Sequence, residues 1–351
     1  MKRALIVMDR RGGRTATQEI SFAQPFKEAK EGPYDIAFTV DDEGDGAIER
    51  AFASDPPDLI VLSRYTAANG VEWIDRARAA GSPAIFHIDD DLLAVPMSLG
   101  PSKYKTYTDP ARLAALLANI ERSDLCYVST PELGRRFSEH GIETAIVAGE
   151  IYCCVAPEEV GALVPPATGP VIGYMGTGGH SADLTAILPA IAKLMDMVPS
   201  LNFELFGTIK MPAELAAFGP RVRHLPPVSD YGAFRARLRS LGWWVGLAPL
   251  EDNAFNRCKA DTKWVEYSLA GIAVVASDLP VYHRACADGC GILATSTDQW
   301  VRGVAGLLYA PGRRHAMVDS AQAKLLERYS CANLRAQVLD VFEEATVHAH
   351  R

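Results

Sequence analysis

The chain has 351 residues and a net charge of −8 at pH 7, with 48% hydrophobic and 22% charged residues. This length exceeds one typical domain and fits two, and the composition is that of a globular protein with sizeable cores. The negative charge argues against a general nucleic-acid coat, so no nucleic-acid partner is expected. Seven cysteines at irregular spacing are not typical of a disulfide framework, which favours a reducing, cytoplasmic setting.

Short β-branched runs alternate with helical patterns in the first half of the chain, as in parallel α/β units. The predicted strands cover residues 4–8, 35–40, 59–63, 84–88, 125–129 and 145–147. The predicted helices cover residues 21–30, 47–54, 71–80, 110–122 and 131–140. The opening apolar run resembles a signal peptide, but charged residues end it too early, so we expect a buried first strand. No stretch of the sequence approaches transmembrane length, so any contact with the inner face of a membrane would be peripheral.

Prolines and glycines interrupt this pattern around residues 150–170, which predicts a domain boundary there. A second alternating run follows. Its predicted strands cover residues 171–174, 202–206, 222–225, 244–248, 273–276 and, more weakly, 291–294. Its predicted helices cover residues 182–197, 231–241, 259–270 and 297–308, with a mostly helical tail over 313–347. We predict an α/β protein of two Rossmann-like, doubly wound domains, 1–155 and 156–330, facing across a ligand cleft, with segment 331–351 packing back on the first domain.

The predicted helix over residues 259–270 carries the most informative pattern in the chain. Lys259, Lys263 and Glu266 are four and three residues apart, which places them in one stripe on a helix, with apolar residues on both sides. A second polar edge lies opposite, so one of the two polar edges is expected to face something other than bulk water. Two ammonium groups suit a diphosphate, and a carboxylate suits a pair of sugar hydroxyls. The alternative is an ordinary docking helix whose Lys263–Glu266 pair is solvated.

A strand, a glycine-rich turn and a helix start follow one another over residues 171–183. Backbone N–H groups in such a turn can converge on an anion, helped by the dipole of the helix that follows. The candidate residues are Gly176, Thr177, Gly178 and Gly179. Many tight turns use glycine for geometry alone, so the motif is weak by itself. Its value lies in its position, because it opens the same half of the chain that carries the two lysines.

Four further side chains of the second half are candidates for binding the same diphosphate ligand, namely Lys210, Asn253, Asn256 and Arg257. Lys210 follows a strand and either reaches a base or phosphate or is a solvated loop lysine. Asn253 either binds substrate hydroxyls or shapes the turn before the key helix. Asn256 fits a helix cap, and Arg257 lies where a guanidinium can approach phosphate oxygens.

Asp89, Asp90 and Asp91 follow the predicted strand over residues 84–88, at the edge where α/β proteins place their chemistry. Two functional interpretations remain open. The acids could hold a divalent metal that bridges a diphosphate, or one of them could act as a general base or bind a sugar acceptor. We expect Asp90 or Asp91 to cap the next helix. His87, within the strand, fits a core histidine better than a catalyst.

Gly12 and Gly13 follow the first predicted strand and form a second glycine loop. The end of a parallel strand faces the cleft, so this loop is a candidate for the acceptor side. A plain surface loop is the alternative.

Together these residues resemble a glycosyltransferase of the GT-B fold, close to family 4 and its group 1 relatives. The similarity is strongest over roughly residues 170–285. The motifs that carry it, in the order of the family, are Gly173-Tyr174-Met175-Gly176, Asn256-Arg257-Cys258-Lys259, Lys263, Glu266-Tyr267, Gly271 and Ser277-Asp278-Leu279-Pro280-Val281-Tyr282. Ile88-Asp89-Asp90-Asp91 also recurs in a bacterial polysaccharide-assembly branch of that group.

The resemblance implies transfer of a sugar from a nucleotide-diphosphate donor to a saccharide, a lipid-linked glycan or another acceptor held by the first domain. Glu266 matches the family's ribose-binding glutamate. Cys258 stands where the family's E-x7-E pattern has its first glutamate. The contacts of that missing carboxylate to the donor sugar are expected to pass to Asp252 or Asn253.

The same resemblance assigns roles in the reaction. Lys259 and Lys263 would stabilise the departing nucleoside diphosphate, Asp89 is the third catalytic candidate, and Asp90 belongs to the acceptor side. Cationic side chains can stabilise that leaving group without a metal, so no obligatory metal or other cofactor is expected. Family 4 implies retention at the anomeric carbon. The rival functions are a sugar-nucleotide epimerase of similar fold and a non-catalytic nucleotide-sugar-binding scaffold.

Overall fold

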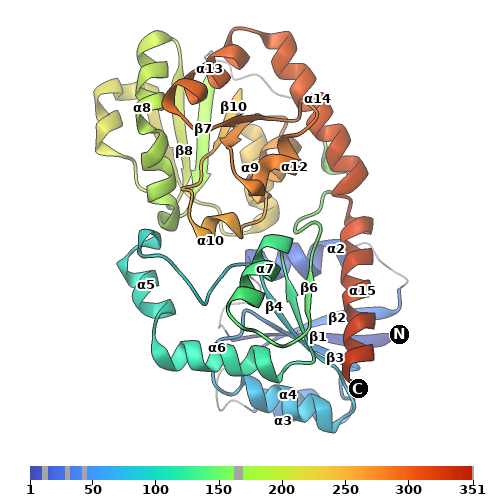
Figure 1. The fold of residues 1–351 in the computed structure, drawn as a ribbon. Helices are drawn as coiled ribbons and strands as arrows, with labels where there is room; N and C mark the ends of the chain where they lie inside the picture. Colours follow the sequence, from blue (N-terminus) through green and yellow to red (C-terminus); the bar gives the residue numbers. More distant parts are fainter. Residues whose placement is uncertain (10–14, 28–31, 42–45, 162–168, 350–351) are drawn as a thin grey trace.

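The computed structural model of the protein describes residues 1–9, 15–27, 32–41, 46–161 and 169–349. Two parallel sheets, each of six strands, lie one above the other, and helices cover both faces of each (Figure 1). This arrangement confirms the predicted α/β fold of two doubly wound domains. The sequence pattern succeeds here because parallel strands are buried on both faces and therefore read as continuous apolar runs.

The first sheet has the strand order β2-β1-β3-β4-β5-β6. Its strands are β1 (Lys2–Met8), β2 (Tyr34–Val40), β3 (Leu59–Ser63), β4 (Ala84–Ile88), β5 (Leu125–Val128) and β6 (Ile146–Ala148). The helical segments of this half are α1 (Ala16–Gln18), the π-helical turn η1 (Glu19–Ala23), α2 (Gln24–Phe26), α3 (Ala47–Phe52), α4 (Gly70–Ala79), η2 (Met97–Leu99), α5 (Pro101–Tyr107), α6 (Pro110–Arg122), α7 (Pro131–Glu139) and η3 (Pro157–Glu159).

The second sheet has the order β12-β11-β10-β7-β8-β9. Its strands are β7 (Val171–Gly176), β8 (Asn202–Gly207), β9 (Val222–Leu225), β10 (Val245–Ala248), β11 (Ala273–Ser277) and β12 (Ile292–Ala294). The helical segments are η4 (Gly178–His180), α8 (Ser181–Met197), η5 (Ala213–Arg221), α9 (Tyr231–Ser240), α10 (Ala254–Arg257), α11 (Thr262–Leu269), α12 (Pro280–Cys286), α13 (Thr297–Leu308), α14 (Pro311–Arg328) and α15 (Cys331–Ala349).

The strand orders determine where a ligand can bind. The direction of winding reverses between β7 and β10 in the second sheet, and at β1, which lies between β2 and β3, in the first sheet. Loops that leave the carboxyl ends of strands at such a reversal diverge and leave a crevice, which is the usual ligand site of doubly wound sheets. The segments that follow β1, β3, β7 and β10 are therefore the ones that the fold places at the cleft.

The last helix, α15, covers the first sheet rather than the second. Its buried residues Leu334, Val338 and Phe342 belong to the same apolar core as Ala4 and Ile6 of β1. They are spaced four residues apart, so one face of α15 meets one face of the sheet. Figure 1 shows α14 and α15 running from the upper domain down to the lower one. The chain thus returns to the first domain and covers one face of its sheet together with η1 and α2.

The segment that carries Lys259 and Lys263 differs from its prediction. Instead of one helix over residues 259–270, α10 ends at Arg257 and α11 begins at Thr262. Lys259 lies in the turn between them, so it does not share a helical stripe with Lys263. The reason is tertiary, because Phe255 and Cys258 pack into the core of the first domain and hold the turn there. The prediction of one continuous helix was wrong at this point.

One other helix differs from its prediction for a physical reason, and one helix end has the conformation expected of it. The helix predicted over residues 21–30 begins at Ala16 and passes through the π-helical turn η1 just before Pro25, which has no N–H to donate to a regular helical ladder. Gly271 follows α11 with φ +74°, the left-handed conformation expected of the residue that ends a helix.

Phe342→Ala is expected to lower the free energy of unfolding by about 3–5 kcal/mol, because it removes a fully buried ring and leaves a cavity. The ring centre of Phe342 lies 5.1 Å from that of Tyr34 in the core beneath α15. Urea denaturation followed by circular dichroism measures the loss. Val347→Ala, on the same helix but with 54% of the residue exposed, should change stability by less than about 0.5 kcal/mol. Equal losses would contradict the packing of α15.

Candidate functional site

Two adjoining cavities are lined by residues that follow the strands of both sheets. The junction cavity has a volume of about 350 Å³ and is lined from both domains. The aromatic cavity has a volume of about 370 Å³ and is lined mainly by the second domain. Thr15, Ala16, Thr177 and His180 line both cavities, so the two form one continuous cleft.

The glycine-rich turn after β7 lies where the two cavities meet. Gly176 lines the aromatic cavity, Gly179 lines the junction cavity and Thr177 lines both, with Gly178 between them in the chain. The neighbouring strand ends at Gly207, which has φ +124°, and a Cβ there would lie 2.2 Å from the carbonyl oxygen of Gly176. Only glycine permits this close approach of the two strand ends.

Lys259 extends from the second domain to the first at the junction cavity. Its Nζ lies 3.1 Å from Oδ1 of Asp90 and 4.6 Å from the centre of the Phe255 ring. The turn that carries Lys259 is tied to the first domain, because the Thr130 hydroxyl donates a hydrogen bond to the carbonyl oxygen of Cys258 at 2.8 Å. The position of Lys259 therefore depends on contacts between the domains.

Lys263 and Glu266 lie one turn apart on α11, and both line the aromatic cavity. Lys263 Nζ is 5.8 Å from the centre of the Tyr174 ring. Burial lowers the pKa of Lys263; attraction to Asp183 opposes this, and repulsion from Lys259 adds to it. An ammonium group in this setting is stabilised when an anion binds beside it.

Glu266 is a buried carboxyl group with one clear partner. The Tyr231 hydroxyl donates to its Oε1 at 3.0 Å. Burial raises the pKa of Glu266 to about 7, against the opposing effects of the Tyr231 hydrogen bond and the positive charges of Lys263 and Arg235. A carboxylate has acceptor capacity for several donors, so this group can accept from neighbouring sugar hydroxyls.

Stacked aromatic rings line the aromatic cavity. The centres of the Phe206 and Phe234 rings are 5.4 Å apart with 13° between their planes, and those of Tyr231 and Phe234 are 6.0 Å apart with 19° between them. Phe206 lies near the end of β8, and Tyr231 and Phe234 lie in the first turn of α9, so two elements of the second domain supply this surface. The sequence analysis missed these rings, because helical spacing alone does not distinguish a cavity wall from core.

Asp89 is held by three partners. It accepts hydrogen bonds from the Thr17 hydroxyl at 2.9 Å and from the Tyr152 hydroxyl at 2.7 Å, and it pairs with Arg64 at 2.5 Å. Asp90, its neighbour, lines the junction cavity. Asp89, directly after β4, thus connects Thr17 on α1, Arg64 after β3 and Tyr152 in the linker between the domains.

Asp90 lies between two cations, Lys259 and the guanidinium of Arg64 at 3.3 Å. Burial by itself would raise the pKa of Asp90, but attraction to Lys259 and Arg64 is stronger and lowers it, so the group is ionised. Arg64, which follows β3, has φ +51°, a conformation that is uncommon outside glycine. No local sequence pattern points to Arg64 as a site residue.

Asp91 has a structural role. It is fully buried, 3.2 Å from the Nε of Arg136 and 3.2 Å from the Nε2 of His140. The expectation that one of these acids caps the next helix is wrong, because η2 begins only at Met97, after Pro96.

The three acids therefore differ in their partners: Asp89 and Asp90 share Arg64, whereas Asp91 pairs with Arg136 and His140. Among the residues that the structure describes, no group of three or more His, Cys, Asp or Glu side chains could hold a metal ion.

Asp183, near the start of α8, organises the loop after β10. Its Oδ1 accepts from the backbone N–H of Glu251 at 2.8 Å and from Nδ2 of Asn256 at 3.0 Å, and its Oδ2 lies 2.8 Å from Nδ1 of His180. The expected helix-cap role of Asn256 is therefore wrong, since Asn253 caps α10 by accepting from the Asn256 N–H at 2.8 Å. The His and Asp near the start of α8 were the available sequence signal for this cluster.

The remaining candidates lie further from the cleft or outside the described residues. Lys210 is exposed and lines neither cavity. Arg257 is exposed and forms two contacts with Asp252, at 2.5 and 2.8 Å. Gly12 and Gly13 lie outside the residues that the structure describes.

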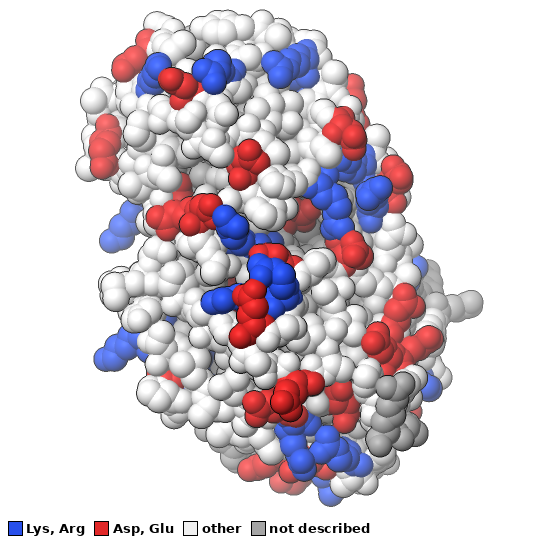
Figure 2. All heavy atoms as spheres, viewed as in Figure 1, with Lys and Arg blue, Asp and Glu red and all other residues white. Residues whose placement is uncertain are grey.

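The lysines and arginines do not form one continuous patch on the face shown in Figure 2, where they are interspersed with acidic residues. None of the helices in the described part of the chain is both long and apolar enough to cross a membrane.

No protein-family model and no curated protein matches the chain. Solved structures, in contrast, match nearly all of it. HepE from Anabaena, in complex with UDP and glucose, aligns with a TM-score of 0.68 and 14% identity over 97% of this chain and 99% of HepE. Sucrose-phosphate synthase from Thermosynechococcus elongatus has a TM-score of 0.68 and 12% identity over 98% of this chain and 99% of that protein.

A UDP-forming trehalose-phosphate synthase from Burkholderia xenovorans also matches, with a TM-score of 0.62 and 14% identity over 98% of this chain and 99% of the synthase. At these identities the similarity shows the fold alone. The chain has the GT-B fold, as the resemblance in the sequence implied.

Glu266→Gln is expected to change how stability depends on pH. Because burial raises the pKa of Glu266 from 4.5 to about 7, the folded state keeps a proton that the unfolded state has lost across this window. The wild type should therefore lose stability relative to Glu266→Gln as the pH rises through it, by up to about 3 kcal/mol. Urea denaturation at a series of pH values measures this difference. Glu214→Gln, at an exposed position of the same domain, is the control. A constant difference between wild type and Glu266→Gln would contradict the prediction.

Proposed function

We propose that the protein is a glycosyltransferase that moves a sugar from a nucleotide-diphosphate donor in the second domain to an acceptor in the first. The observation that carries this proposal is the continuous cleft between the two domains, with Lys259, Lys263 and the glycine-rich turn at its centre. HepE, which shares the fold, has been crystallised with UDP and glucose, and this supports a donor of the same class.

The aromatic cavity suits the nucleoside part of such a donor. The stacked rings of Phe206 and Phe234 offer an apolar surface for a base. Glu266 lies in the same cavity, where its carboxyl group can accept from the ribose hydroxyls. Lys263 and the backbone N–H groups after Gly176 are then placed to bind the diphosphate. This order leads the donor from the aromatic cavity towards the junction cavity.

The junction cavity suits the transferred sugar and the acceptor. Asp90 and Arg64 contribute polar groups from the first domain, and Lys259 contributes a cation from the second. Asp89 acts through Arg64, because its ion pair fixes the guanidinium. We propose a saccharide or a lipid-linked glycan as the acceptor, in keeping with the polysaccharide-assembly branch that the sequence resembles.

The chemistry that this arrangement favours is stabilisation of the leaving group. As the bond between sugar and diphosphate breaks, negative charge grows on the diphosphate, and preorganised cations lower the energy of that charge most effectively in a cleft that excludes water. Lys259 and Lys263 fill this role in the proposal without an obligatory metal. The resemblance to family 4 supports retention of anomeric configuration.

Lys263→Ala is expected to weaken binding of the preferred nucleoside diphosphate by about 10- to 100-fold, because it removes a charge-assisted contact. A thermal-shift panel of UDP, GDP, dTDP and ADP identifies that nucleotide, since a ligand that binds only the folded state raises the Tm. The Tm without nucleotide should hardly change. Lys193→Ala is the control, since Lys193 forms an exposed ion pair with Asp298 at 2.9 Å. If Lys259→Ala and Lys263→Ala both bind like the wild type, the proposed diphosphate site is refuted.

Slow release of nucleoside diphosphate is expected when the matching nucleotide sugar is added without an acceptor, and chelation with EDTA should leave the rate unchanged. Chromatography of the products over time measures both outcomes. Conversion of the sugar without nucleotide release would indicate an epimerase instead. Binding without any turnover would favour a scaffold. A rate abolished by EDTA and restored by Mg²⁺ would contradict the proposed independence from metal.

A further inference from the structure

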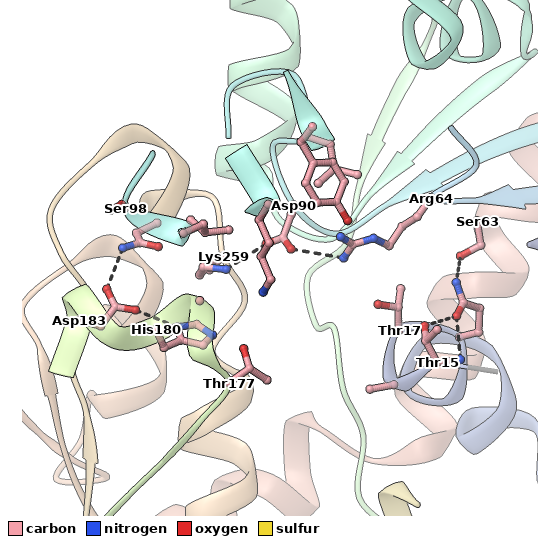
Figure 3. A pocket seen from close by; sticks show the side chains of 18 of the residues that line it. Thr15, Thr17, Ser63, Arg64, Asp90, Ser98, Thr177, His180, Asp183 and Lys259 are labelled. Carbon is pink, nitrogen blue, oxygen red and sulfur yellow. Dashed lines mark hydrogen bonds and ion pairs between the residues drawn. The ribbon is translucent and has the colours of Figure 1, made fainter. Parts of the chain in front are cut away.

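His180 lies in one of the two segments that line both cavities, the other being formed by Thr15 and Ala16. It ends η4, directly before α8, and lines the junction cavity and the aromatic cavity alike. Figure 3 shows the Asp183–His180 pair on one side of the junction cavity and Arg64 on the other, with Lys259 and Asp90 between them. A ligand that extends through both cavities therefore has to pass His180.

Asp183 fixes the orientation of the imidazole. His180 Nδ1 lies 2.8 Å from Oδ2 of Asp183, whose side chain is only 5% exposed. The other oxygen of Asp183 is already engaged by Glu251 and Asn256. A carboxylate accepts hydrogen bonds, so Nδ1 carries the proton in this pair. In the neutral ring, Nε2 is then a bare acceptor.

The charges around His180 come from several elements. Lys259 and Lys263 face it from the segment before α11 and from α11 itself, Asp183 from α8 and Asp90 from the end of β4. Glu251, after β10, and Lys103, on α5, line the junction cavity with it. Repulsion from Lys263 and burial lower the pKa of His180 to about 4, and Asp183 opposes them. The imidazole is therefore neutral near pH 7 in the protein without ligand.

We propose that His180 contacts the donor diphosphate where the two cavities meet, and that it takes up a proton from solvent when the diphosphate binds. This inference rests on the proposed function. A diphosphate between the lysines would neutralise the repulsion that disfavours a second positive charge at this place. A neutral Nε2 would also present a lone pair to phosphoryl oxygens, whereas a protonated Nε2–H donates a charge-assisted hydrogen bond to them. No covalent bond changes, and the only transfer is one proton from water to Nε2.

The proposed role has a consequence for the reaction. The proton that His180 takes up when the donor binds stays on the imidazole as the sugar departs. The imidazolium is then a third cation, with Lys259 and Lys263, when the negative charge on the leaving group is greatest. His180 would thus combine recognition of the diphosphate with its stabilisation.

Isothermal titration calorimetry of UDP binding tests the proposal in two buffers of different ionisation enthalpy, because the dependence of the heat on the buffer gives the number of protons taken up. At about pH 6 the wild type should take up as much as about one proton more than His180→Gln. The terminal phosphate of UDP also titrates at about pH 6, so the same comparison is made with UDP-glucose, whose diphosphate has no terminal phosphate group. His180→Gln should also bind UDP about tenfold more weakly at about pH 6 than the wild type, with a smaller loss at about pH 8.

His283→Gln is the matched control. His283 Nε2 also lies 2.8 Å from an aspartate, Asp278, but the pair is exposed, with 53% and 47% of the two side chains accessible, and it lines neither cavity. This variant should match the wild type in affinity and proton uptake.

Equal proton uptake by wild type and His180→Gln would overturn the role of His180 while leaving the glycosyltransferase proposal intact. Failure of the wild type to bind any of UDP, GDP, dTDP and ADP would overturn both proposals. Asp183 is not the residue to replace in this test, because Asp183 also holds Glu251 and Asn256. The Tm of His180→Gln without nucleotide shows whether the variant folds normally.

Discussion

The concentration of positive charge where the two cavities meet is the constraint on which the rest of the site depends. Lys263 is half-buried, and its pKa is lowered by burial and by repulsion from Lys259. The carboxylates nearby are already committed, Asp90 to Arg64 and Lys259, and Asp183 to three donors. Burying like charges together is unfavourable unless an opposite charge joins them. In the proposed function an anionic donor would supply that charge, so the ligand would complete the electrostatics of the cleft.

The segment between α10 and α11 links this site to the first domain. Phe255 and Cys258 contribute to the core of that domain although they belong to the second half of the chain, and Thr130 binds the backbone beside Lys259. In the proposed function, one short stretch would therefore carry contacts to both the donor and the acceptor. α15 adds a second connection, because it covers the first sheet directly after α14 leaves the second domain. A relative movement of the domains would consequently change the position of Lys259.

Much of the fold followed from local pattern, and the errors occurred where distant contacts intervened. The alternation of buried strands and amphipathic helices marked both sheets. The predicted single helix over residues 259–270 failed because Cys258, which follows α10, packs into the core of the first domain and holds the turn before α11 there. The three acids after β4 looked equivalent in sequence, yet each meets a different partner set. Asp91 pairs with Arg136 on α7, whereas Asp90 pairs with a lysine 169 positions away.

The sequence by itself determined the class of fold and the placement of Lys263 and Glu266 on one face of a helix, because burial on both faces of a parallel sheet and the period of a helix can be recognised from neighbouring residues. Only the tertiary structure decided that Asp90 forms an ion pair with Lys259 and that Asp183 orients His180 towards the cleft. These contacts depend on how loops after separate strands converge at the edge of a sheet. The periodicity of neighbouring residues does not predict which of these loops will meet.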